Sequence, residues 1–125
     1  MVFLVGLDRF SKYLAIKKNH YLCNEDMAWG VSMPFKMVII AAIILIMVFL
    51  FWQKVKKRFT SFQQLFFFVL ILSGALSNFW DRWSYGCVID FINIDFFNFP
   101  WFNFADSFIL LGVMGWFYTE KTLDY

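Results

Sequence analysis

The sequence predicts an all-α integral membrane protein with four transmembrane helices, and three observations support this fold class. The 125-residue chain is 62% hydrophobic and only 16% charged. A soluble domain of this size exposes a large share of its surface and could not hide so much apolar area. The apolar residues are gathered into four segments, and nineteen Phe and six Trp are typical of lipid-facing helices and interfacial belts.

Charge and cysteine content exclude several other classes. A net charge of +2 is too small to indicate a nucleic-acid partner. Cys23 and Cys87 have neither CxxC nor metal-ligand spacing, so we expect no disulfide framework and no zinc site. The two thiols could pair only if both faced an oxidising exterior. His20 is expected to be a solvated loop residue, and we expect no metal or organic cofactor.

The first predicted helix covers residues 1–16 and is short. Sixteen residues give ~24 Å of helix, against a hydrocarbon core of ~30 Å. Charges inside the apolar run, with no small-residue cleavage site after it, argue against a cleavable signal peptide. Asp8 and Lys12 are spaced i, i+4 towards the outer end of this helix, so they can lie on one face and compensate each other.

The second and third helices are predicted over residues 35–53 and 59–80. Residues 17–34 before them are polar and turn-rich, which indicates a loop with a short strand or hairpin. Residues 37–52 contain no polar side chain, and 59–80 contain no charge. Ser73 and Ser77, beside Gly74 and Ala75, form a small-residue face that allows another helix to approach closely.

The last part of the chain combines an extended segment with a fourth helix. Residues 83–102 lack a helical period, and the alternation in VIDFINIDF predicts an extended segment in the membrane interface. The fourth helix is predicted over 103–119, with Asp106 in its first turn and Gly112 and Gly115 available for close packing. We expect residues 1–125 to form a single membrane-embedded domain.

The basic run KVKKR at residues 54–58 predicts the topology. It joins the second and third helices and should be cytoplasmic by the positive-inside rule. Four spans then place both termini in the cytoplasm. The loop 17–34 and the stretch 73–107 would share the outer face, although Lys17, Lys18 and Lys36 weaken the contrast in charge.

Asp90 and Asp106 are the candidate catalytic pair. Two carboxyl groups brought together in a water-poor site share a proton, so one can act as a general base on water while the other polarises a carbonyl. Their spacing alone does not establish that they meet. They could instead cap helices or pair with Arg82.

Other polar side chains lie near these two aspartates in the sequence. Asn78, Asp81 and Arg82 are spaced i, i+3 and i+4, so one helical face can present all three. They could form part of the site, or only an interfacial cap with an Asp81–Arg82 pair. Asn103 could hold a peptide or the aspartates in place, or it could simply be the N-cap of the fourth helix.

Several of these residues stand in motifs that resemble those of lipoprotein signal peptidases, also called type II signal peptidases, which are aspartic peptidases. The motifs are GALSN at 74–78, DR at 81–82, VIDF at 88–91 and FPWFNFADS at 99–107. The resemblance implies four helices with a small β cradle and an interfacial segment on the outer face. It also implies that Asp90 and Asp106 are catalytic.

The resemblance assigns supporting or substrate-binding roles to other positions. They are Asn24, Asn78, Arg82, Asn103, Asp8, Lys12, Gly74 and Ala105. The chain departs from the family pattern at Asp26 and Ser77, where glycine is usual, and at Trp29, where phenylalanine is usual. It also looks shortened ahead of Asp8, which suggests either a start further upstream or a helix that spans only part of the bilayer.

The implied activity is removal of the signal peptide from a diacylglyceryl-modified bacterial prolipoprotein, with cleavage before the lipidated Cys. The partners would be this substrate and the lipids of the bacterial inner membrane, and we expect a monomer. A catalytically inactive scaffold or assembly protein with the same fold is the alternative. A channel or transporter is less well supported, because the second and fourth helices have almost no polar residues at mid-membrane.

Overall fold

Four helices and one small sheet make up the computed structural model, which describes residues 1–25, 33–56 and 62–123. The helices are α1 (Val2–Lys17), α2 (Met33–Lys56), α3 (Phe62–Tyr85) and α4 (Phe104–Leu123). Strands β1 (Leu22–Asn24) and β2 (Val88–Asp90) form a two-stranded antiparallel sheet. A short 3-10 helix, η1 (Asp95–Phe97), follows β2. The prediction of a mostly helical chain with four helices and a small sheet is therefore confirmed.

Helix α3 is the centre of the bundle, because it packs against α1, α2 and α4. Its packing on α4 depends on small residues. A Cβ added to Gly74 would lie 2.3 Å from the carbonyl oxygen of Ala105, and one added to Gly112 would lie 2.8 Å from that of Phe67. The absence of side chains at these positions is therefore what lets the two helix backbones approach each other.

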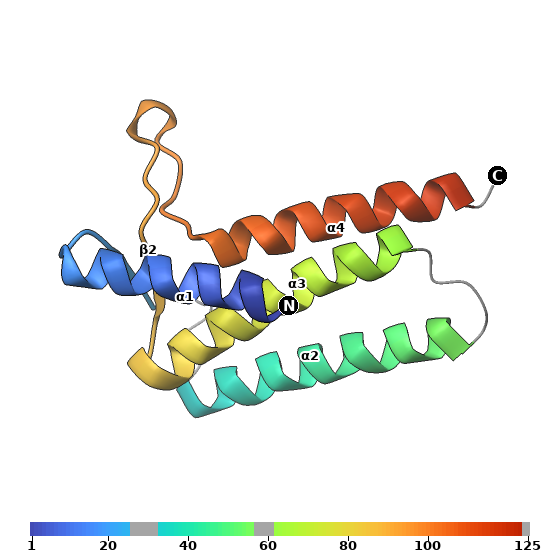
Figure 1. The fold of residues 1–125 in the computed structure, drawn as a ribbon. Helices are drawn as coiled ribbons and strands as arrows, with labels where there is room; N and C mark the ends of the chain where they lie inside the picture. Colours follow the sequence, from blue (N-terminus) through green and yellow to red (C-terminus); the bar gives the residue numbers. More distant parts are fainter. Residues whose placement is uncertain (26–32, 57–61, 124–125) are drawn as a thin grey trace.

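The helices run alternately in opposite directions, so four helix ends meet at one end of the bundle (Figure 1). These are the ends of α1 and α3 and the starts of α2 and α4. The segment between β2 and α4 projects sideways from this end as an arm, closed by a bridge between Ile92 and Phe102. The helix α3 continues to Tyr85, and η1 lies in the arm, so residues 83–102 are not uniformly extended as predicted.

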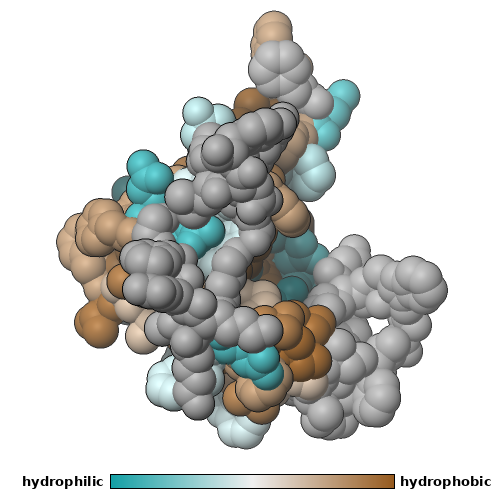
Figure 2. Space-filling model, turned by 90° about the vertical axis from the view of Figure 1, so that its right-hand side faces the viewer, coloured by the Kyte–Doolittle hydropathy of each residue, from teal (hydrophilic) through white to brown (hydrophobic). Residues whose placement is uncertain are grey.

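The outer surface of the bundle is rich in large apolar side chains. Leu45, Phe66, Leu110 and Phe117 are among the exposed ones. Figure 2, which views the molecule end-on, shows brown hydrophobic side chains on its flanks beside hydrophilic ones. Of the helices in the described residues, α3 alone is both long and apolar enough to cross a membrane, and shorter apolar stretches lie at Ile40–Gln53 and Phe104–Thr119.

The interior is unusual because most of its largest fully buried side chains are polar. Asp8, Asp81 and Asn103 have no exposed surface, and Lys12 is 1% exposed. Charged groups removed from water persist only when they are paired and hydrogen-bonded. The partners of these buried polar side chains therefore identify the candidate site.

Candidate active site

Asn103 and Asp106 together begin α4. The Oδ1 atom of Asn103 accepts a hydrogen bond of 2.9 Å from the backbone N–H of Asp106, and the Asp106 carboxylate accepts one of 3.2 Å from the backbone N–H of Asn103. This reciprocal pattern is a capping box, which satisfies two otherwise unpaired backbone donors at the start of a helix. Asp106 also gains from the positive end of the helix dipole.

The side-chain amide of Asn103 extends from this cap to Asp90 at the end of β2. Its Nδ2 atom lies 2.8 Å from Oδ1 of Asp90, 3.3 Å from the carbonyl oxygen of Ile89 and 3.2 Å from Oδ1 of Asn78. One residue therefore donates hydrogen bonds to the carboxylates of both Asp90 and Asp106. Asn103 is therefore the N-cap of α4, and it also contacts both candidate carboxylates, as the second interpretation from the sequence requires.

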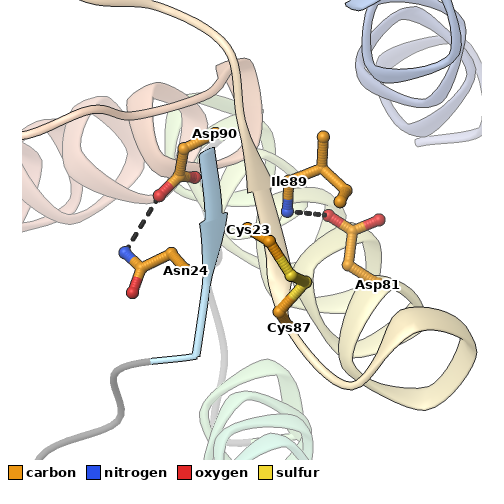
Figure 3. The surroundings of a disulfide bond; sticks show 6 residues. All are labelled: Cys23, Asn24, Asp81, Cys87, Ile89 and Asp90. Carbon is orange, nitrogen blue, oxygen red and sulfur yellow. Dashed lines mark hydrogen bonds between the residues drawn. A yellow bond between two sulfur atoms is a disulfide. The ribbon is translucent and has the colours of Figure 1, made fainter. Parts of the chain in front are cut away.

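The second oxygen of Asp90 is bound by β1. Nδ2 of Asn24 donates a hydrogen bond of 3.0 Å to Oδ2 of Asp90 (Figure 3). Burial raises the pKa of the Asp90 carboxyl, and the negative charge of Asp106 raises it further. Hydrogen bonds from Asn24 and Asn103 and the charge of Lys12 act in the opposite direction but do not cancel the effect. Asp90 is thus the carboxyl that burial and charge favour in its protonated form.

Asn78 connects Asp106 to α1. Its Nδ2 donates a hydrogen bond of 2.8 Å to Oδ1 of Asp106, and its Oδ1 accepts one of 3.1 Å from Nζ of Lys12. The amide is thereby oriented with its donor towards the carboxylate. Both oxygens of Asp106, like both of Asp90, accept hydrogen bonds from the protein.

Lys12 is the centre of a buried charge network between α1 and α3. Its ammonium group lies 2.7 Å from the carboxylate of Asp8 and 2.6 Å from that of Asp81. Asp8 also accepts hydrogen bonds from the Ser77 hydroxyl at 2.6 Å and from the backbone N–H of Ala105 at 3.0 Å. The expected Asp8–Lys12 pair is present, and it also holds the first turn of α4.

Arg9 and Ser77 make contacts that sequence reasoning missed, and Asp81, which it considered as part of the site, has other partners than expected. Asp81 accepts a hydrogen bond of 3.1 Å from the backbone N–H of Ile89, the residue before Asp90 (Figure 3). Among the described residues its ion pairs are with Arg9 and Lys12, so the Asp81–Arg82 pair considered from the sequence was wrong. Arg9 stands one residue from Asp8, and its charge inside an apolar helix was a signal that a buried partner existed.

Arg82 lies instead at a pocket between α2 and α3 that the first turns of α4 also line. The pocket has a volume of about 370 Å³. Arg82, Asn78 and Asp106 are polar members of its lining, and the rest is apolar, with Ile40, Ile43, Ile44 and Met47 from α2. Asp106 therefore faces a cavity that could hold an apolar ligand beside a charged group.

The sulfur atoms of Cys23 and Cys87 form a disulfide bond, although the sequence predicted no disulfide framework and allowed this pairing only on an oxidising exterior. The residues are 64 positions apart in the sequence but their Cα atoms are 5.5 Å apart, because β1 pairs with β2. Sequence spacing gives no information about such a distance, so the pairing of the strands was needed to predict the bond.

Some expectations lie outside the described residues. They concern Asp26 and Trp29, together with part of the KVKKR run. Within residues 1–25, 33–56 and 62–123, no group of three or more His, Cys, Asp or Glu side chains is placed to hold a metal ion.

Comparison with known proteins identifies the family to which this arrangement of residues belongs. The model of the signal peptidase (SPase) II family matches residues 1–120. The chain belongs to the signal peptidase II family. Proteins named lipoprotein signal peptidase are its relatives, including one from Francisella tularensis subsp. novicida (strain U112) that is 42% identical over 95 residues. That match covers 74% of this chain and 56% of the relative, so the chain spans little more than half the length of this signal peptidase II.

Other relatives match over more of their length. A lipoprotein signal peptidase from Enterococcus faecalis (strain ATCC 700802 / V583) is 34% identical over 129 residues, covering 89% of this chain and 78% of the relative. A solved bacterial membrane enzyme, determined by the in meso method at 1.9 Å, has a TM-score of 0.77 at 30% identity, covering 91% of this chain and 84% of that one. The fold of this chain is therefore similar to that of a bacterial membrane enzyme.

Proposed function

We propose that this chain is an aspartic endopeptidase of the inner membrane that removes the signal peptide from diacylglyceryl-modified prolipoproteins, cutting before the lipidated Cys. The single observation that supports this most strongly is that Asn103 donates hydrogen bonds to the carboxylates of both Asp90 and Asp106. Residues from β2 and α4 are thereby held as a pair, as the chemistry of two cooperating carboxyl groups requires.

The two carboxyl groups have different tasks in this proposal. Asp90, whose pKa is raised by burial and by Asp106, holds the shared proton and donates a hydrogen bond to the scissile carbonyl oxygen. Asp106 acts as the general base and accepts a proton from the attacking water. The tetrahedral intermediate collapses when the leaving nitrogen takes up that proton and the carbon–nitrogen bond breaks.

The pocket beside Asp106 fits the lipid part of such a substrate. Its lining from α2 and α3 is mainly apolar, and its polar residues lie near the proposed reacting carboxylate. Acyl chains attached to the substrate Cys would occupy the apolar part, while Arg82 and Asn78 contact the peptide backbone. This arrangement accounts for a peptidase site placed at the end of a bundle with an apolar surface.

The proposed topology follows from the helix directions and the sequence. Helices α1 to α4 all cross the membrane, and the basic run between α2 and α3 lies in the cytoplasm together with both termini. The site would then face the outer side of the membrane, at the bundle end where α4 begins (Figure 1). The enzyme would act as a monomer, with membrane lipids as its surroundings.

A gel-shift assay on a diacylated prolipoprotein tests the proposed activity. We expect the chain to convert the precursor, and Asp90→Asn and Asp106→Asn to reduce conversion below detection while the protein still inserts and accumulates. Asp95→Asn is the matched control, because Asp95 is exposed on η1 and its substitution should leave conversion unchanged.

Two outcomes of this assay would count against the proposal. Normal conversion by either dyad variant would exclude the assigned mechanism. A correctly inserted chain that converts no precursor would instead indicate an inactive scaffold with the same fold.

A further inference from the structure

The disulfide and the Asn24–Asp90 hydrogen bond lie on opposite faces of the same two strands. In the antiparallel register Cys23 pairs with Ile89 and Asn24 pairs with Val88. Side chains alternate along a strand, so Cys23 and Asn24 point to opposite faces. Each reaches diagonally across the ladder, Cys23 to Cys87 and Asn24 to Asp90 (Figure 3).

Strands β1 and β2 differ in how firmly the rest of the molecule holds them. All three residues of β2 are buried, and its backbone at Ile89 is bound by Asp81 and by Asn103. By contrast, β1 has only three residues, of which Leu22 and Cys23 are exposed. An isolated pair of such short strands is marginally stable in water. The disulfide therefore joins a weakly held strand to a firmly held one.

We propose that the Cys23–Cys87 disulfide is a positioning element for the reaction, because it fixes the register that directs Asn24 at the Asp90 carboxylate. A slip of β1 by one residue would turn Asn24 to the opposite face and remove its hydrogen bond. This inference rests on the proposed peptidase function for its effect on turnover, but its effect on Asp90 can be observed separately.

Loss of the bond should be visible in the protonation of Asp90. The hydrogen bond from Asn24 favours the ionised carboxylate, so its removal should make Asp90 harder to ionise. The other groups acting on Asp90 come from different elements: Lys12 on α1, Arg82 on α3, and Asp106 and the cap residue Asn103 at α4. None of these is carried by β1, so they remain in place when the disulfide is reduced.

Infrared titration of the protonated Asp90 carboxyl provides the direct test. The band is assigned by its loss in Asp90→Asn, and its midpoint is compared between oxidised protein, protein reduced with a phosphine, and the double variant Cys23→Ser, Cys87→Ser. We expect reduction to move the midpoint to higher pH. Turnover of a diacylated prolipoprotein should fall by about tenfold, because the Asp90 carboxyl loses one of the two side-chain amides that hold it in place.

The variant Asn24→Ala, with the disulfide intact, separates positioning from general stabilisation. If the disulfide acts through Asn24, reduction of Asn24→Ala should change the acid dissociation constant of Asp90 and the turnover by less than about twofold. The effects of two changes that act through the same contact do not add. Reduction of the folded wild-type protein keeps the test valid even if the double Ser variant does not fold.

An unchanged Asp90 midpoint on reduction would overturn the proposal. The proposal would also be overturned if reduction and Asn24→Ala had additive effects on the Asp90 midpoint and on turnover. A shifted midpoint in a protein that cleaves no prolipoprotein would support the positioning role and count against the peptidase function, so the two failures can be told apart.

Discussion

Asn103 shows how one side chain can serve both the fold and the site. Its carbonyl oxygen caps α4, and its amide nitrogen binds Asp90, so the two ends of the amide group face different elements. An aspartate or serine could supply the cap alone. A hydroxyl can also accept and donate, but from a single atom, whereas the amide carries its acceptor and its neutral donor on two atoms that reach different elements.

Substitutions of Asn103 should therefore separate the two roles. We expect Asn103→Ser to keep the cap and most of the stability, and Asn103→Ala to lose about 1 kcal/mol of unfolding free energy. Both variants lose the donor to Asp90, so both should lose about 100-fold in turnover through misplacement of the carboxyl pair. Thermal unfolding in detergent and the gel-shift assay measure the two quantities. Full activity in Asn103→Ser would contradict the bridging role.

The raised pKa of Asp90 predicts a pH dependence of stability. A carboxyl whose pKa is higher in the folded than in the unfolded protein binds more protons when folded. The unfolding free energy therefore falls as pH rises from about 4, the usual pKa of Asp, through the folded pKa. Asp90→Asn lacks this group, so the unfolding free energy of the variant should rise relative to that of wild type as pH increases through this range. Denaturation of both proteins across the range measures the difference, and parallel curves would refute it.

For single residues, the sequence indicated which side chains gather at the candidate site, but it did not indicate the hydrogen bonds that connect them. Asp90 and Asp106 were selected as a pair, and the structure joins them through Asn103. The contribution of Ser77 was missed because a serine among small residues also fits simple packing. Its hydroxyl contacts Asp8 on another helix, and no local pattern contains that information.

At the scale of the elements, α1 contacts α3 and α4 through a buried charge network, and Asp8 and Lys12 are two of its three buried residues. We expect Lys12→Met to lose about 3–5 kcal/mol, because the carboxylates of Asp8 and Asp81 would be left buried without their shared cation. Lys17→Met, on the exposed end of the same helix, is the control and should change little. Equilibrium unfolding in detergent compares them. Similar stabilities for the two variants would show that the network is not needed to hold α1.

The contact between α3 and α4 predicts an asymmetry between two glycines. In Gly74→Ala the new Cβ would lie 2.3 Å from the carbonyl oxygen of Ala105, so the helices must move apart. We expect a loss of about 1–3 kcal/mol and of activity, because Ala105 precedes Asp106. Gly6→Ala has no heavy atom within 4 Å of the new Cβ and should be neutral or stabilising. Thermal unfolding and the gel-shift assay compare them, and equal behaviour would contradict the close approach.

The helices themselves were predictable because long apolar segments and their flanking polar residues are local features. The two-stranded sheet was less predictable from the sequence. The residues of β1 and β2 form only three pairs, and such short strands carry almost no periodic signal. Their pairing depends on the ends of α1 and α3 meeting at one end of the bundle, which is a property of the packed molecule.

At the scale of the whole molecule, the pocket between α2 and α3 should determine how the lipid part of a substrate binds. Ile44→Trp would fill the apolar part of this pocket, so we expect KM for a diacylated prolipoprotein to rise at least tenfold with little change in kcat. Leu45→Trp is the matched control, because Leu45 is 68% exposed on the same helix. Steady-state kinetics in mixed micelles measure both. An unchanged KM in Ile44→Trp would place the lipid elsewhere.

The disulfide shows which feature of the whole molecule could not be predicted from the sequence. Composition and spacing argued against it, yet two strands 64 residues apart bring the cysteines together. The same strands bring Asn24 to Asp90, so the bond and part of the site depend on one long-range pairing. Neither could be derived before the packing of the four helices was known.

The capping box of α4 carries one more consequence. Glutamate or glutamine is the usual acidic or amide partner at the third position of such a box, and this chain has the shorter aspartate there. Lengthening that side chain by one methylene would suit the helix start, but it would move the acid group away from the hydrogen bond that Asn78 donates to it. The capping box alone does not require the shorter acid, whereas the general-base role proposed for Asp106 depends on where its carboxylate lies.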